Sequence, residues 1–167
     1  VMEMMDDIKT HVRDWTDEGC VGDYLTKLLN REAFDRSGLI YGLGHAVYTQ
    51  SDPRCEVFRD YVHRLAEEKG LERELTLYTN VERVGKELLM KRRNKRAIST
   101  NIDFYSGLVY EMLGLPMELY TPLFAVARIA GWSAHRMEEL SAGGKLIRPR
   151  YECVEQHRGY VPMEERR

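Results

Sequence analysis

The chain has 167 residues, of which 43% are apolar and 31% are charged, with a net charge of −2. This size permits one or two compact units, and the near-neutral charge argues against a general nucleic-acid surface. No apolar run is long enough to cross a bilayer, and the first residues are acidic where a secretory signal is basic. We therefore expect a soluble, cytoplasmic protein with neither a nucleic-acid nor a membrane partner.

Apolar residues recur every three or four positions along most of the chain, which predicts an all-α fold. The chain opens within an amphipathic helical pattern, and in order we then expect helices at 21–36, 52–69, 71–93, 101–113 and 121–140. Beyond them, residues 145–150 are predicted to be extended and the polar tail at 155–167 to fray.

Caps mark several of these helix ends. Asp52-Pro53 and Thr121-Pro122 each combine an N-cap side chain with proline at the first helical position. Gly70 and Gly114 are predicted ends. Two buried stripes are expected: the helix at 21–36 contributes Tyr24, Leu25, Leu28, Leu29 and Phe34, and that at 52–69 contributes Val57, Phe58, Tyr61, Val62 and Leu65.

Cysteine spacing predicts no metal site. The three cysteines, Cys20, Cys55 and Cys153, are an odd number without the spacing of metal ligands. They support neither a zinc site nor a disulfide framework, and reduced thiols are expected.

His45 stands in a glycine loop that runs into Asp52-Pro53-Arg54. An imidazole can donate a proton to a developing alkoxide, glycines let a backbone approach a ligand, and Arg54 could pair with a carboxylate. A lone histidine is more often structural, and Arg54 could equally be an exposed cation in a first helical turn. The combination indicates a site for an acidic ligand.

Asp103 and Arg128 are the other candidates with a chemical argument. Asp103 falls in a first helical turn, where the dipole alone accounts for an acidic residue, but once desolvated it could act as a general base. Arg128 lies in so apolar a segment that it needs an anionic partner, with Phe124 one turn before it. Arg148 is held beside Pro149, although the surface is its default place.

The basic run at 91–96 has two interpretations. It is most simply a solvated helix end, where cations complement the dipole. Alternatively, it contacts the phosphates of a nucleotide-like cofactor.

Four motifs recur together: the glycine-histidine loop before Asp-Pro-Arg, Asn-Ile-Asp-Phe-Tyr-Ser-Gly at 101–107, Ala-Arg-Ile-Ala-Gly-Trp-Ser-Ala-His at 127–135, and Ile-Arg-Pro-Arg at 147–150. In order and spacing they resemble the citrate synthase family. The resemblance implies an all-α fold, with the small domain at 1–113 and, at 114–167, a C-terminal helix and extended tail returning to the large domain and the dimer interface.

The resemblance also implies the reaction: acetyl-CoA condenses with oxaloacetate, and hydrolysis yields citrate and CoA, without a tightly bound cofactor. Asp103 matches the base that deprotonates the acetyl methyl group, and His45 matches the histidine that protonates the oxaloacetate carbonyl. The resemblance further assigns carboxylate binding to Arg54, Arg128 and Arg148 (the last across a homodimer interface), the acyl site to Phe124, and CoA contacts to Leu43, Gly44, Ala46 and Val47.

Two departures from the family pattern stand out. This chain has Thr49 where many members carry a basic residue near the CoA phosphates. We expect Lys95 and Arg96 to supply the missing positive charge. The enol-stabilising histidine of a His-Gly-Gly motif would precede Val1, and the chain corresponds to less than half of a typical member. We therefore expect an inactive fragment of a citrate synthase.

Two alternatives remain open. One is 2-methylcitrate synthase, which uses propionyl-CoA. The other is a non-catalytic helical module that binds an acidic metabolite or a partner protein, with Asp103 only a helix cap.

Overall fold

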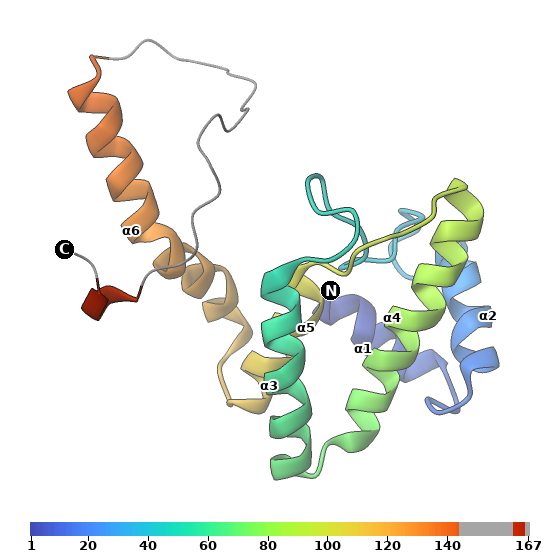
Figure 1. Cartoon of the computed structure of the whole chain (residues 1–167). Coiled ribbons are helices and arrows are strands. Elements are labelled where there is room, and N and C mark those ends of the chain that lie inside the picture. Colours follow the sequence, from blue (N-terminus) through green and yellow to red (C-terminus); the bar gives the residue numbers. More distant parts are fainter. Residues whose placement is uncertain (144–161, 166–167) are drawn as a thin grey trace. The chain divides into compact units, whose positions relative to one another are not determined.

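The computed structural model describes residues 1–143 and 162–165, and every regular element in these ranges is a helix (Figure 1). The predicted all-α class is confirmed. The described chain contains α1 (Met2–His11), α2 (Glu18–Leu29), α3 (Pro53–Lys69), α4 (Glu72–Arg93), α5 (Ile102–Met112), the 3₁₀ helix η1 (Met117–Leu119), α6 (Tyr120–Ser141) and the 3₁₀ helix η2 (Met163–Glu165). None of the described helices has the length and apolar character needed to span a membrane.

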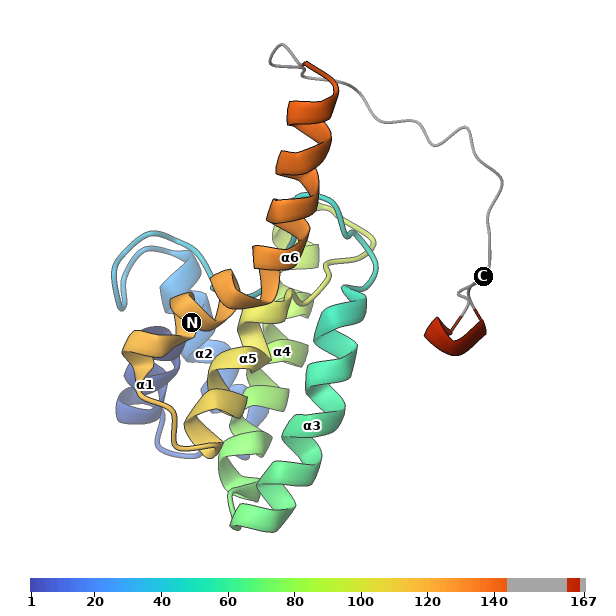
Figure 2. The same cartoon turned by 90° about the vertical axis from the view of Figure 1, so that its left-hand side faces the viewer.

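Contacts divide the chain into two compact units, Val1–Phe124 and Ala125–Arg167. In the first unit α3 packs on α5 and α4, α2 packs on α4, and α1 contacts α2 (Figures 1 and 2). The division at 113/114 suggested by the family resemblance concerns domains of a longer protein and stays a prediction. The segment at 145–150 lies outside the described residues, as does most of the predicted tail.

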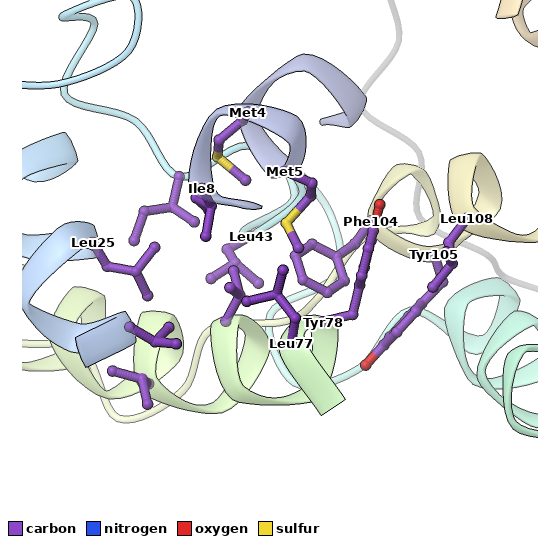
Figure 3. Close-up of a cluster of buried hydrophobic side chains, with 14 of the residues drawn as sticks. Met4, Met5, Ile8, Leu25, Leu43, Leu77, Tyr78, Phe104, Tyr105 and Leu108 are labelled. Carbon is purple, nitrogen blue, oxygen red and sulfur yellow. The ribbon is translucent and has the colours of Figure 1, made fainter. Parts of the chain in front are cut away.

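The core of the first unit is formed where α1, α2, α4 and α5 meet (Figure 3). Aromatic rings of α4 and α5 fill its centre: Tyr78 and Phe104 lie edge to face with centroids 5.6 Å apart, and Phe104 and Tyr105 at 5.0 Å. Such pairs add to the burial of apolar area that stabilises the unit. Phe104 and Tyr105, which follow Asp103 on α5, therefore hold this helix in the core.

Four helices end in the same way, with a left-handed residue and a main-chain bond that reaches back five residues. Gly70 and Gly114 provide this conformation after α3 and α5, as predicted, with φ of 68° and 71°. Asn94 does so after α4. After α2 the residue is Arg31, with φ of 66°, and Glu32 N–H donates to Lys27 C=O at 2.9 Å.

The predicted helix at 21–36 is therefore too long. The helix ends at Leu29. The left-handed residue after it is Arg31 and not glycine, so the sequence contained no recognisable stop signal. Phe34 then lies in a turn with φ of 50°, half-buried rather than on a helical stripe.

Two further details of the prediction are wrong. On α3 the buried positions are Cys55, Val62 and Ala66, whereas Val57 and Tyr61 are 55% and 53% exposed. Two of the three buried residues of α3, Cys55 and Ala66, are small. A prediction that considers only large apolar residues therefore places the buried face at the wrong angle around the helix. Thr121 is not an N-cap, because η1 leads directly into α6 at Tyr120.

α6 has no buried residue, and most of its large apolar side chains are exposed. Val126, Ile129 and Trp132 are 68%, 59% and 53% exposed.

Candidate active site

The loop that carries His45 is bound to the segment before α5. Gly44 N–H donates to Ser99 C=O at 2.7 Å, Asn101 N–H donates to Gly42 C=O at 2.9 Å, and Leu43 and Thr100 form an antiparallel bridge. Two residues after Asn101 comes Asp103. These bonds therefore bring the two proposed acid-base residues into one local structure.

Leu43 anchors this loop in the core. Its side chain is 9% exposed, and a Cβ on Gly85 of α4 would lie 2.6 Å from Leu43 Cδ1. The side chain occupies the space that this glycine leaves (Figure 3). Only the backbone of Leu43 remains available to a ligand.

His45 is exposed, and main-chain donors fix its ring. Nδ1 accepts the N–H groups of Val47 and Tyr48 at 3.0 and 3.1 Å, so the neutral ring carries its proton on Nε2. Nε2 lies 3.4 Å from Nη2 of Arg54, which is also a donor. A ligand oxygen placed against both groups would accept two hydrogen bonds.

Arg54 is oriented by Asp52, the N-cap of α3. Nε and Nη2 of Arg54 donate to the two oxygens of Asp52 at 2.9 and 2.8 Å, and Ile102 N–H donates to Asp52 Oδ2 at 3.2 Å. Asp52 is fully buried, and its hydrogen bonds from Arg54 hold the carboxyl pKa below the ordinary value. Asp52 therefore links the start of α3 to the start of α5.

Asp103 is exposed in the first turn of α5, where Asn101 Oδ1 accepts its N–H at 3.0 Å. It lines a cavity of about 590 Å³ together with Gly42, Ser106, Tyr110 and Phe124. Its carboxylate also acts on Arg54: hydrogen bonds to Asp52 first, and the charge of Asp103 from farther away, raise the pKa of the guanidinium. Asp103 and Arg54 are thus within electrostatic reach of each other.

A second cavity, of about 720 Å³, lies between the glycine loop and the segment that follows α4. Its lining includes His45 and five of the six residues suggested for CoA contact by their family positions or charge, namely Leu43, Gly44, Ala46, Lys95 and Arg96. Val47 is the one that the structure does not place there; it is 74% exposed, and its N–H is bonded to His45. The cavity combines exposed cations with open main chain, which suits a phosphate-bearing ligand.

The remaining candidates are Phe124, Arg128 and Arg148. Phe124 closes the first unit and lines the cavity of Asp103, 42% exposed. Arg128 is half-buried on the part of α6 that belongs to the second unit. Arg148 lies outside the described residues.

Asp52 and Asn101 hold site residues in place, a role that the sequence analysis did not predict. Asp52 was expected only as an N-cap, yet it also orients Arg54. Asn101 caps α5 and in addition donates from Nδ2 to Gly44 C=O at 3.0 Å. A signal existed for Asp52, because an arginine two residues after an N-cap aspartate can fold back onto it.

The fold and the site define an all-α domain that presents an imidazole donor, a carboxylate and an oriented guanidinium around two cavities. The family model described as citrate synthase, C-terminal domain, matches residues 1–150, and the chain belongs to the citrate synthase family. It is 41% identical over 128 residues to a citrate synthase of Synechocystis, covering 76% of this chain and 31% of that protein.

Solved structures agree. Citrate synthase from Thermotoga maritima matches with a TM-score of 0.61 and 30% identity, covering 98% of this chain and 41% of that one. The Thermoplasma acidophilum enzyme, in a ternary complex with carboxymethyl coenzyme A and oxaloacetate, matches with a TM-score of 0.57 and 28% identity, covering 95% and 44%. The chain thus spans between 31% and 44% of the length of these three proteins.

Proposed function

We propose that this chain is the part of a citrate synthase that supplies the aspartate base, the carbonyl-binding histidine and part of the carboxylate clamp. The complete protein condenses acetyl-CoA with oxaloacetate and hydrolyses the product to citrate and CoA. The observation that carries the proposal is the pair of donors on His45 Nε2 and Arg54 Nη2, 3.4 Å apart, in a loop bonded to the start of the helix that bears Asp103.

The chemistry follows from these groups. The carboxylate of Asp103 removes a proton from the acetyl methyl group, and the resulting enolate carbon attacks the ketone carbon of oxaloacetate. The ketone oxygen gains the negative charge and takes the proton of His45 Nε2–H, while Arg54 holds an adjacent carboxylate. The imidazolate left on His45 then recovers a proton, and the loss of the methyl proton from Asp103 balances this gain. Fixed donors stabilise this charge because they need no reorientation as it develops.

The remaining roles belong to the same proposal. Arg128 and Arg148 bind further carboxylate groups, Arg148 across a homodimer interface, and Phe124 lines the acyl site. The CoA part of the thioester occupies the cavity of about 720 Å³, with its phosphates at Lys95 and Arg96, and its acetyl group reaches the cavity of Asp103 and Phe124. The relative's complex with carboxymethyl coenzyme A and oxaloacetate supports both ligand classes.

A thiol-release assay tests the proposal. The chain joined to the N-terminal region of the Synechocystis relative should release CoA from acetyl-CoA only when oxaloacetate is present, whereas the 167 residues alone should not, because they contain no His-Gly-Gly. Faster release from propionyl-CoA would instead identify a 2-methylcitrate synthase. Release from neither thioester by the joined protein would contradict the proposal.

Neutralising Lys95 and Arg96 together, each to glutamine, should raise KM for acetyl-CoA by about 30-fold, since each charge-assisted contact to a phosphate contributes on the order of 1 kcal/mol at an exposed position. The paired control neutralises Lys91 and Arg92, which belong to the same basic run but do not line the cavity. Similar KM values for the two double variants would remove Lys95 and Arg96 from the CoA site.

A further inference from the structure

Glu82 is a buried carboxylate on α4 for which the proposed reaction has no use. It is 8% exposed, and four side chains donate to it. Arg59 Nη2 and Lys86 Nζ reach Oε1 at 2.6 Å, Thr100 Oγ1 donates to the same oxygen, and Tyr105 OH donates to Oε2 at 2.5 Å.

These donors come from the segments that carry the proposed site. Thr100 lies between Ser99 and Asn101, the two residues whose main chain is bonded to the His45 loop. Tyr105 follows Asp103 by two residues on α5. Arg59 belongs to α3, the helix whose first turn contains Arg54. One carboxylate therefore touches all three segments.

The carboxylate stays ionised in this position. Burial raises the pKa of Glu82, but hydrogen bonds from Lys86, Thr100 and Tyr105 outweigh it and the pKa is lowered overall. Burial, and next the charge of Glu82, raise the pKa of Tyr105, so its hydroxyl remains a donor. Each bond to the anion is directional and stronger than a bond to a neutral acceptor.

A contribution to folding stability does not by itself explain why a charged residue is buried at this position. The cost of removing charges from water offsets much of the attraction in a buried ion pair, and apolar residues of similar volume often serve as well. What a saturated carboxylate adds is geometry, because its oxygens fix where each donor can lie.

We propose that Glu82 is a positioning residue: through Thr100 and Tyr105 it sets the loop of His45 and the first turn of α5 relative to each other. The inference that this matters for turnover rests on the proposed function, but the positioning itself can be measured without catalysis.

Amide hydrogen exchange on the 167-residue chain measures the positioning. In Thr100→Val, which keeps every charge and nearly the same volume, the N–H groups of Gly44 and Asn101 should exchange about tenfold faster or more, while the amides of α2 and α4 keep their protection. Thr79→Val is the matched control, since that hydroxyl bonds only to Leu75 C=O of its own helix. Glu82→Gln should reproduce the effect, and Glu87→Gln, at a surface ion pair with Arg83, should not.

Kinetics on the joined protein measure the consequence. Thr100→Val should lower kcat by about 10- to 100-fold with little change in KM for the thioester, because misplacement on the order of 1 Å costs up to about 10² in rate. Unchanged exchange at Gly44 and Asn101 in both variants would overturn the proposal, and so would uniformly faster exchange throughout the helices of Thr100→Val. If the unsubstituted joined protein releases no thiol, the proposed function fails, and the exchange data still decide the role of Glu82.

Discussion

Asp103→Asn in the joined protein should lower kcat by about 10²–10⁴-fold, with little change in KM for acetyl-CoA, because asparagine keeps the shape of the side chain and cannot accept the methyl proton. The helix should survive the change. Its N-cap is Asn101, whose side chain still accepts the N–H of residue 103, and the loss of one exposed first-turn charge costs only about 0.3–1 kcal/mol. Steady-state thiol release and a urea titration measure the two effects.

The matched control is Glu72→Gln, which removes the same charge from the first turn of α4, at a residue that does not line the cavity of Asp103. Its kcat should not change. If both variants turned over at the unsubstituted rate, Asp103 would contribute only a favourable charge to the first turn of α5, and the chain would be a binding module rather than part of an enzyme.

Gly42→Ala should destabilise the first unit by about 2–5 kcal/mol, the sum of a backbone cost and a packing cost. Gly42 has φ of 88°, a conformation that costs an L side chain about 1–2 kcal/mol. In addition, a Cβ there would lie 2.6 Å from Cδ2 and 3.1 Å from the main-chain Cα of Phe104, a fully buried residue that cannot turn away. Overpacking of this kind adds about 1–3 kcal/mol. Urea unfolding gives the free energy directly.

Gly44→Ala is the control, because Gly44 has φ of 99° but a Cβ at this position would meet nothing within 4 Å. It should show only the backbone cost of about 1–2 kcal/mol. Equal destabilisation by the two substitutions would mean that Phe104 does not restrict the loop. A larger loss at Gly42 would show that the site loop and the aromatic core are one packing unit.

Helix positions were largely predictable because caps and periodicity agree along most of the chain. Asp52-Pro53 and the two stop glycines act where expected, and the helix expected from residue 101 begins at Ile102, with Asn101 as its N-cap. The prediction was wrong at the end of α2, where the left-handed residue is an arginine, and on the buried face of α3, where small residues form the contact. Neither can be recognised from hydrophobicity alone.

The candidate site was predictable only as a set of residues. Motif resemblance named His45, Arg54 and Asp103, but not the bonds that join their segments. Those bonds depend on main-chain groups of Gly42, Gly44 and Ser99, which no side-chain pattern encodes. The roles assigned to all six candidates, His45, Arg54, Asp103, Phe124, Arg128 and Arg148, stay predictions.

His45, Arg54 and Asp103 belong to one compact unit, whereas Arg128 belongs to the other. A movement between the units would therefore carry the proton donor and the proton acceptor together and leave the spacing between them unchanged. The distance between donor and acceptor is therefore set within the first unit alone, and substitutions in the second unit should leave it unchanged.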